Sequence, residues 1–224
     1  MLKCPVCYSE DINKKILRHH EFKNNWWHEC NTCNHIFTCF KEVYKSDKSF
    51  TTNKERANNY INYFKKELVG KCNSIIEIGS ANDFYFLKEI HKLDKNIKLF
   101  VNDSFDYSND KRLPEFITFI KNLEDIKKTE ICYMSHSLEH IPDIDNFLNI
   151  LSNKIKTFLI EIPISVNTEW LIKRRIRTKQ SGWHYHYYTK NSLIKKFNQF
   201  DYQYKNIDVE THENCYNFIF EKNK

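Results

Sequence analysis

The chain has 224 residues, of which 41% are hydrophobic and 15% aromatic, and its formal net charge is +6 at pH 7. This length and hydrophobic content suit one medium domain with a small appendage. Only 3 glycines and 4 prolines are present, which argues against a disordered or low-complexity protein. The modest positive charge permits an anionic partner without requiring nucleic acid. No apolar run reaches the roughly 18 residues that a membrane span needs, and the first residues lack the apolar core of a signal peptide.

Two Cys-x-x-Cys pairs near the N-terminus, Cys4–Cys7 and Cys30–Cys33, predict a metal site. Four thiolates around one ion form the closed arrangement of structural zinc. The segment between the pairs suits two short strands that return the chain to the metal. A redox role is less expected, because redox Cys-x-x-Cys motifs follow a strand and open a helix.

The other cysteines are scattered along the chain at Cys39, Cys72, Cys132 and Cys215. This usage indicates a reducing cytoplasm rather than a disulfide framework.

In chain order, residues 1–45 are expected to form short strands and turns around the metal, before a polar linker. A helix is predicted for 54–69, with its apolar residues on one stripe. Strands are then predicted at 74–78, 97–101, 116–120, 131–134 and 157–162. Helices are predicted at 84–93, 144–155 and 191–200. Two late strands, 202–209 and 216–221, are expected to form an antiparallel pair.

Apolar strands separated by helical stretches predict an α/β fold with a mostly parallel sheet covered on both faces. In such sheets, ligands bind beyond the carboxyl ends of the strands. Polar and acidic residues recur at these positions in Glu77–Asp83, Asn102–Phe105, Ser135–Asp143 and Glu161–Pro163. The ligand site is therefore expected at this edge of the sheet.

Five segments resemble the class I S-adenosylmethionine-dependent methyltransferases in content and order. They are IIEIGSANDFYFL, LFVNDS, YMSHSLEHIPDIDNFL, FLIEIP and HYHYYTKNSLIKKF. The most specific part, SHSLEHIPD, is similar to the family's serine-histidine-x-leucine-glutamate-histidine pattern. More narrowly, the chain resembles bacterial members with an N-terminal zinc ribbon that are often found in sugar, surface-polysaccharide or capsule pathways. The resemblance covers nearly the whole chain and implies a zinc ribbon at 1–45 and a Rossmann-like methyltransferase domain at 46–224.

The resemblance implies that S-adenosylmethionine is held by the loops after the strands. The implied cofactor-binding residues are Glu77, Gly79, Ser80, Ala81, Asn82, Asp103, Ser104, Asn122, Leu123, Ser135 and His136. Gly79 would let the backbone approach the methionine portion, and Asp103 would accept both ribose hydroxyls. The loop departs from the family pattern, because Ala81 and Asp83 stand where glycines are usual. Asp83 is expected to cap the following helix instead.

Histidines would supply the acid–base chemistry. Methyl transfer needs an acceptor lone pair roughly 3–3.5 Å from the methyl carbon. An oxygen acceptor often also loses a proton, which a histidine with a pKa near neutrality can accept. The candidates are His140, at the mouth of the site, and His184 and His186, in the HYHYYT stretch. His140 or His184 is the candidate base, and a role limited to packing and hydrogen bonding around the pocket is the other interpretation; the residues leave both open.

A basic segment between Pro163 and Gly182 is expected to overhang the acceptor. Arginine pairs bidentately with phosphate oxygens, and aromatic rings stack on bases or sugars. The implied substrate-binding residues are Arg174, Arg175, Trp183 and Tyr187. They predict an anionic acceptor, such as a phosphorylated metabolite or a nucleotide-linked sugar. A solvated basic helix face is the alternative.

The leading hypothesis is therefore a methyltransferase acting on a small molecule. Sugar C-methyltransferases with such a ribbon usually carry a further C-terminal domain, and this chain ends at Lys224, so O-methylation is expected, with N-methylation open.

A non-catalytic methyltransferase-like scaffold is the second hypothesis, because loop glycines are missing. A nucleic-acid methyltransferase is less favoured, because Ser135–Leu138 replaces the Asn/Asp-Pro-Pro-Tyr/Phe motif of amino-directed enzymes. Zinc is expected to be structural.

Ribbon residues between the two cysteine pairs are expected to face the acceptor site or a partner. They are His19, His20, Trp26, Trp27 and His28.

Overall fold

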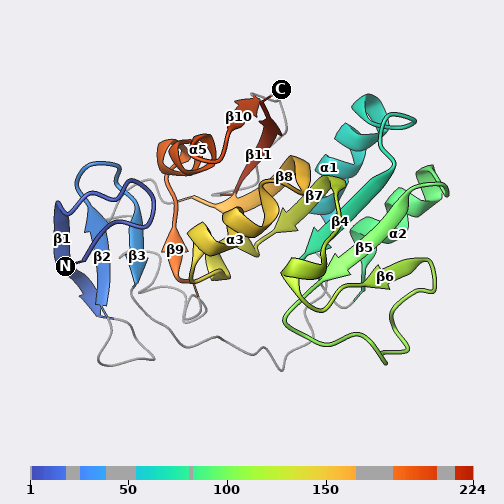
Figure 1. Ribbon diagram of the computed structural model, residues 1–224, viewed down its shortest axis with the longest axis horizontal. Helices are drawn as coiled ribbons and strands as arrows, with labels where there is room; N and C mark the ends of the chain where they lie inside the picture. Colours follow the sequence, from blue (N-terminus) through green and yellow to red (C-terminus); the bar gives the residue numbers. More distant parts are fainter. Residues whose placement is uncertain are drawn as a thin grey trace.

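The computed structural model of the protein describes residues 2–18, 26–38, 54–80, 83–164, 184–205 and 215–223, without the side chains of 14–18, 26 and 56. A small sheet is built mainly from the N-terminal segment, and its order is β1-β2-β3-β9. Its strands are β1 (Ile12–Arg18), β2 (Trp26–Cys30), β3 (Ile36–Thr38) and β9 (His186–Tyr187). All of its pairings are antiparallel. Figure 1 shows this small sheet beside a larger one, with β9 as the strand that comes from the later part of the chain.

The larger sheet has seven strands in the order β10-β11-β8-β7-β4-β5-β6. They are β4 (Ser74–Ile78), β5 (Lys98–Asn102), β6 (Ile117–Phe119), β7 (Thr129–Ser135), β8 (Ile155–Pro163), β10 (Tyr202–Lys205) and β11 (Cys215–Lys222). The pairings among β4, β5, β6, β7 and β8 are parallel. β11 is antiparallel to both β8 and β10. The prediction of a mostly parallel sheet with an antiparallel late strand is confirmed.

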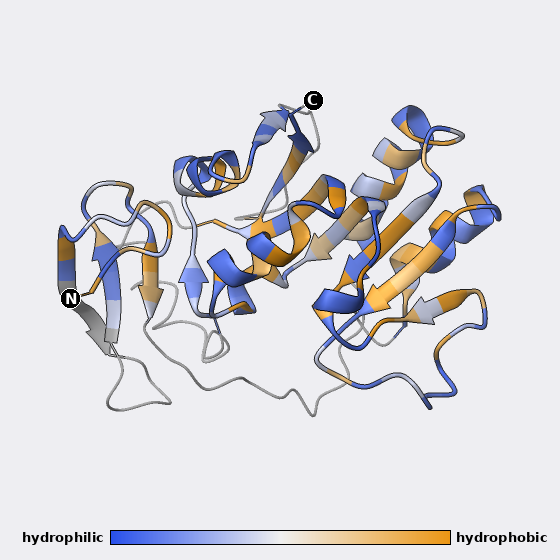
Figure 2. Ribbon diagram, in the orientation of Figure 1, coloured by the Kyte–Doolittle hydropathy of each residue, from blue (hydrophilic) through white to orange (hydrophobic). Residues whose placement is uncertain are grey.

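Helices cover both faces of this sheet. They are α1 (Lys54–Glu67), α2 (Tyr85–Leu93), α3 (Ile144–Leu151) and α5 (Lys190–Asn198), with the 3-10 turns η1 (Leu123–Asp125) and η2 (Leu138–His140). Successive strand residues point to opposite faces. Ile75 and Tyr133 pack with residues of α1 and α2, whereas Ile76 and Cys132 pack with residues of α3 and α5. Figure 2 shows apolar residues concentrated in the strands between these helices.

Two predicted helix boundaries are wrong. The helix predicted for 144–155 ends at Leu151, because Ser152 closes it and Ile155 begins β8 by pairing with Thr129. Asp83 is not the cap of α2: the N-cap position is Phe84, in a left-handed conformation with φ 49°. The Asp83 carboxylate accepts a long hydrogen bond, 3.4 Å, from the backbone N–H of Tyr85. Among the described residues, no helix is both long enough and apolar enough to cross a membrane.

The small sheet is anchored to the larger domain by a polar network. The Tyr8 hydroxyl donates to Asp145 Oδ1 over 2.8 Å, and the fully buried Lys196 donates to both groups. The Gln199 amide donates to the carbonyl oxygen of Val6 over 2.7 Å. The apolar core around α3 and α5 also continues through Val6 into the described N-terminal residues, 2–18 and 26–38, which are called the ribbon below. The expected domain boundary near residue 45 falls outside the described residues and stays a prediction.

Candidate functional site

The two cysteine pairs form turns with the same hydrogen bonds. In the first, the N–H of Cys4 donates to Ser9 and the Cys4 carbonyl accepts from Tyr8; in the second, Cys30 bonds to His35 and Asn34 in the same way. Tyr8 and Asn34 both have positive φ, 59° and 55°. The repeated geometry turns each pair of thiols to one side of its loop.

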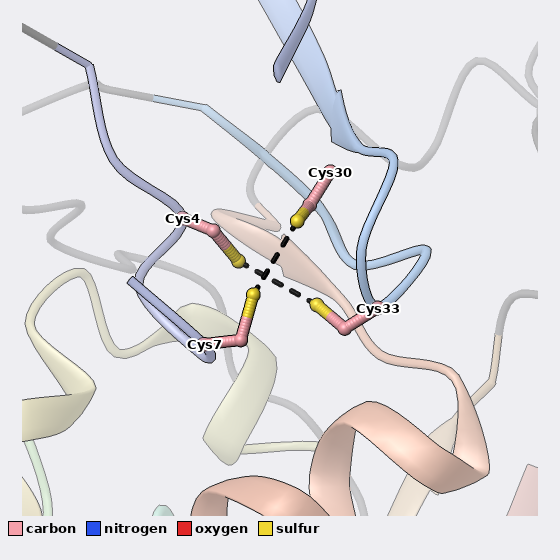
Figure 3. Close-up of side chains that lie close together, drawn as sticks. All are labelled: Cys4, Cys7, Cys30 and Cys33. Atoms are coloured by element: carbon pink, nitrogen blue, oxygen red, sulfur yellow. Dashed lines mark hydrogen bonds between the residues drawn. The ribbon is translucent and has the colours of Figure 1, made fainter. Parts of the chain in front are cut away.

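The four thiols converge on one point (Figure 3). Cys4 Sγ lies 3.6 Å from Cys33 Sγ, and Cys7 Sγ lies 3.4 Å from Cys30 Sγ. Four thiolates about 2.3 Å from a tetrahedral ion are about 3.8 Å apart, so the cluster fits zinc after a small expansion. The Cys33 thiol and nearby backbone N–H groups, including that of Val6, lower the pKa of Cys4 to about 5. The same contact raises the pKa of Cys33, so the cluster favours the thiolate at Cys4 and the thiol at Cys33.

Polar side chains line one face of the large sheet near its carboxyl edge. Glu77 lies opposite Tyr133, and Ser135 lies opposite Glu161, so the three polar residues share the face covered by α1 and α2. The Ser135 hydroxyl donates to Glu161 Oε2 over 2.9 Å. These residues stand among apolar neighbours in the second half of their strands, and both carboxylates are buried.

Glu77 is the most conspicuous of these groups. Its Oε2 atom is buried and has no hydrogen-bond partner among the described residues. Burial raises the pKa of Glu77 to about 8; the Ser80 hydroxyl opposes this rise, and the carboxylates of Asp83 and Asp103 add to it. A cationic group placed here would meet the Oε2 atom, which has no hydrogen-bond partner among the described residues.

Gly79 and Asp103 shape the adjoining loops. Gly79 has φ 74°, and a Cβ there would lie 2.1 Å from the Ser137 hydroxyl oxygen. The position therefore requires glycine for close packing against the loop after β7. Asp103 Oδ1 accepts from the backbone N–H of Phe105 over 2.8 Å, which fixes the turn after β5. Burial raises the pKa of Asp103.

The other predicted cofactor residues are placed as follows. Ser104 is exposed next to Asp103, and Ser80 is buried next to Glu77. Asn122 precedes η1 and donates to Asp125 Oδ2 over 2.8 Å, while Leu123 is half-buried. Several predicted residues lie outside the described residues: Ala81, Asn82, Arg174, Arg175, Trp183, His19 and His20.

Glu139 organises the histidines at the end of β7. Its side chain is fully buried, and Oε1 lies 3.4 Å from His136 Nδ1 and 3.9 Å from His184 Nε2. The rings of His140 and His184 meet edge to face, 4.7 Å apart. Burial would raise the pKa of Glu139, but the three imidazoles outweigh it and lower that pKa to about 2. The structure thus brings His140 and His184 together around an ionised carboxylate.

His136 lies between Glu139 on one side of its ring and Cys215 and Glu161 on the other. Its Nε2 atom is 3.4 Å from Cys215 Sγ and 4.0 Å from Glu161 Oε1, on the opposite side of the ring from Glu139. Burial would lower the pKa of His136, but Cys215 and Glu139 outweigh it and raise that pKa to about 10. The backbone of His136 has φ 51°, an uncommon conformation for a non-glycine residue.

His186 does not join this group, contrary to expectation. It lies in β9, is 2% exposed, and its Nδ1 atom is 3.1 Å from His35 Nε2 in the ribbon. Burial lowers the pKa of His186 to about 4, so it packs as a neutral ring between ribbon and domain. Tyr187 is also buried, between His184 and Trp27, with ring centroids 5.1 Å from each.

Two of the ribbon residues that were expected to face the acceptor site or a partner are described. Trp27 is fully buried and packs on Tyr187, whose ring contacts that of His184. His28 packs against Phe37 within the ribbon. The side chain of Trp26 is outside the described residues.

Sequence reasoning missed Cys215 and did not assign a role to Glu161. Cys215 looked like a scattered buried thiol, because only the pairing of β11 with β8 brings it to the edge of the sheet. Glu161 carried a usable signal, since it is the only charged residue among the last seven residues of β8.

Comparison with known proteins supports the fold. No family model matches the chain, and no curated protein matches it. The solved structure of PigF with SAH has a TM-score of 0.55 and 12% identity over 76% of this chain and 64% of its own. For an O-methyltransferase family protein from Burkholderia thailandensis, the TM-score is 0.55 and the identity 9%, over 75% of this chain and 56% of its own. For human N-acetylserotonin methyltransferase in complex with SAM, the TM-score is 0.54 and the identity 12%, over 75% of this chain and 52% of its own.

The chain thus spans about half to two-thirds of the length of these structures. At such low identities the likeness concerns the course of the backbone. The seven-stranded sheet and its helices have the fold of these methyltransferases.

Proposed function

We propose that the protein is an S-adenosylmethionine-dependent methyltransferase that methylates an oxygen atom of a small anionic molecule. The observation that carries this proposal is the pair His140 and His184 around the buried Glu139, at the carboxyl edge of a sheet with the methyltransferase fold. Ligands in open α/β sheets bind at this edge.

The residues at the edge fit the cofactor. S-adenosylmethionine carries a cationic sulfonium and an ammonium group, and the buried Glu77 has a carboxylate oxygen without a partner among the described residues. Glu77 and Gly79 would hold the methionine portion, Asp103 the ribose hydroxyls, and Asn122 and Leu123 the adenine. When bound, the cofactor supplies an electrophilic methyl group.

The chain's own groups would handle the acceptor proton. His184 is the preferred base, because Glu139 Oε1 lies 3.9 Å from its Nε2 atom and holds an ionised carboxylate beside the ring. A carboxylate beside an imidazole fixes the ring and stabilises the imidazolium that forms. His140 contacts the same ring and is the alternative base.

The acceptor class follows from charge. Five basic residues stand close together in the segment after β8: Lys173, Arg174, Arg175, Arg177 and Lys179. Guanidinium groups favour phosphate oxygens, so we propose a phosphorylated metabolite or a nucleotide-linked sugar. A place in surface-glycan or capsule biosynthesis is supported by the sequence resemblance.

The test is methyl transfer from labelled S-adenosylmethionine to a panel of phosphorylated metabolites, nucleotide-linked sugars and their neutral counterparts. Turnover with an anionic acceptor and none with its neutral counterpart is expected. The double replacement of Arg174 and Arg175 by alanine should raise KM for that acceptor. Replacing the exposed Lys127 and Lys128 removes the same charge elsewhere and should leave KM unchanged. Equal KM values in the two double variants would refute the acceptor assignment.

A further inference from the structure

Three side chains from separate elements bring ligand atoms together next to the histidine cluster. His136 follows β7, Glu161 lies in β8, and Cys215 begins β11. One nitrogen, one oxygen and one sulfur atom from these residues all lie within 4.8 Å of one another. Cys215 and Glu161 are each 2% exposed, whereas the His136 side chain is 30% exposed. The site is therefore deep but reachable from the His136 side.

From this geometry we propose a second metal-binding site, formed by His136 Nε2, Glu161 Oε1 and Cys215 Sγ, for a divalent ion of the zinc class. Mixed nitrogen, oxygen and sulfur ligands suit zinc, a borderline-soft ion. In a tetrahedral zinc site a sulfur and a nitrogen ligand are about 3.5 Å apart. The distance between Cys215 Sγ and His136 Nε2 is 3.4 Å. Glu161 Oε1, 4.0 Å from the same nitrogen, needs only a small inward shift.

The arrangement suits a metal better than a cysteine nucleophile activated by histidine. In a nucleophile–base pair, the thiol alone approaches the ring nitrogen. Here the buried carboxylate of Glu161 approaches the same Nε2 atom as Cys215, and one N–H cannot align with both acceptors. A divalent cation satisfies the two anionic ligands and the imidazole lone pair together.

The surroundings also match those of a metal ligand set. Histidine ligands almost always donate their other ring N–H to a carboxylate or carbonyl, and ligating carboxylates are hydrogen-bonded in turn. His136 Nδ1 faces Glu139 Oε1 at 3.4 Å. Glu161 Oε2 accepts from the Ser135 hydroxyl over 2.9 Å, which orients the other oxygen. The Glu161 contact is thus a hydrogen bond, whereas Glu139 Oε1 lies at ion-pair distance from His136 Nδ1 and needs a small shift to accept its N–H.

Three protein ligands leave one position of a tetrahedral ion for water or substrate, as in catalytic zinc sites. We assign this position to the acceptor oxygen, an extension that rests on the proposed function. Metal binding would lower the pKa of an acceptor hydroxyl. The proton would pass to His184. The metal site itself does not depend on this extension.

Zinc stoichiometry tests the site. The zinc-loaded full chain is dialysed against rising Zn²⁺ concentrations, and bound metal is measured by elemental mass spectrometry. We expect saturation at about two ions per chain, one in the four-cysteine cluster and one here. The variants Cys215→Ser and Glu161→Gln should lose one ion and keep the other. Glu139→Gln should weaken the second site by about 10- to 100-fold, as expected for an outer partner of a ligand.

The matched control is Cys72→Ser, which alters another buried thiol whose Sγ donates to the Ser74 carbonyl oxygen. It should keep both ions. Saturation of the wild-type chain at one ion would overturn the proposal whether or not the variants fold. A second ion retained in Cys215→Ser would overturn it too. Cofactor binding is measured separately. A protein that binds two zinc ions but no S-adenosylmethionine would refute the proposed function and would still support the metal site.

Discussion

The four-cysteine cluster and the histidine cluster around Glu139 are built on opposite principles. The cysteine cluster uses two short repeats with the same turn geometry, and four like ligands face one point. The histidine cluster collects different side chains: His136 after β7, Glu139 and His140 from η2, and His184 from the segment before β9. Its neighbourhood contains buried carboxylates and a residue with positive φ.

The difference suits the cysteine cluster to stabilising the fold and the histidine cluster to chemistry. A closed set of four thiolates leaves no position for a substrate, which is typical of structural metal sites. A buried, mixed cluster with perturbed pKa values is typical of functional sites. The two regions are nevertheless coupled. β9, which begins two residues after His184, pairs with ribbon strand β3. The N–H of Tyr185 donates to the Glu139 carbonyl oxygen over 2.8 Å.

The largest effect is expected from breaking the ribbon. The variant Cys4→Ser should lose the zinc ion of the four-cysteine cluster and unfold at a lower temperature. The binding free energy of a structural zinc, about 10–16 kcal/mol, contributes to folding, so losing the ion removes stability. Thermal unfolding with parallel zinc analysis measures this. Since β9 depends on β3, methyl transfer should fall as well. Full activity in a zinc-free ribbon variant would contradict the coupling.

Removing the base should have the next largest effect. The variant His184→Ala should lower kcat about 10²- to 10⁴-fold, the usual contribution of a general base, with cofactor affinity unchanged. Steady-state kinetics and calorimetry measure the two quantities. His91→Ala, a histidine on α2 that stacks on Phe116, is the control and should leave kcat unchanged. A kcat loss no greater than that of the control would remove His184 from the mechanism.

The polar network of Tyr8, Asp145 and Lys196 can be weakened without changing a residue of the four-cysteine cluster or of the histidine cluster. The variant Asp145→Asn leaves the fully buried Lys196 without its carboxylate partner. Breaking a buried ion pair costs about 3–5 kcal/mol, and the lower end applies because Asp145 is one-third exposed. Urea unfolding measures the change. Lys92→Met removes the exposed pair with Glu89 and should leave the midpoint unchanged. Similar midpoints for both variants would contradict the anchoring role.

The effect spread most thinly over conditions concerns Glu77 and the dependence of stability on pH. Its folded pKa of about 8 exceeds the ordinary value of 4.5, so between these values the folded state binds more protons than the unfolded state. The contribution of Glu77 to the free energy of unfolding is therefore present at low pH. It is lost as pH rises towards 8, by at most about 1.4 kcal/mol per pH unit. Thermal unfolding across this range should show a flatter pH dependence in Glu77→Gln than in the wild type. Parallel profiles would show that Glu77 titrates normally.

The sequence predicts the features that depend on neighbours along the chain. The strand at 74–78 has the predicted bounds, and the late antiparallel pair forms as expected. The positions of Cys215 and His186 depend instead on pairings between distant segments. Phe37 pairs with His186 through a strand of two residues, too short to leave a periodic pattern. The cap of α2 was missed because Phe84 adopts a left-handed conformation that its type does not favour.

Calorimetric titration of the zinc-loaded chain with S-adenosylmethionine, and with its demethylated product, tests whether this edge of the sheet binds the cofactor. We predict saturable binding at one site, weakened in Asp103→Ala and unchanged in the matched acidic variant Asp201→Ala, which lies in the turn before β10. Absence of binding at about 1 mM, a binding free energy weaker than about 4 kcal/mol, would contradict the assignment of this edge of the sheet to the cofactor.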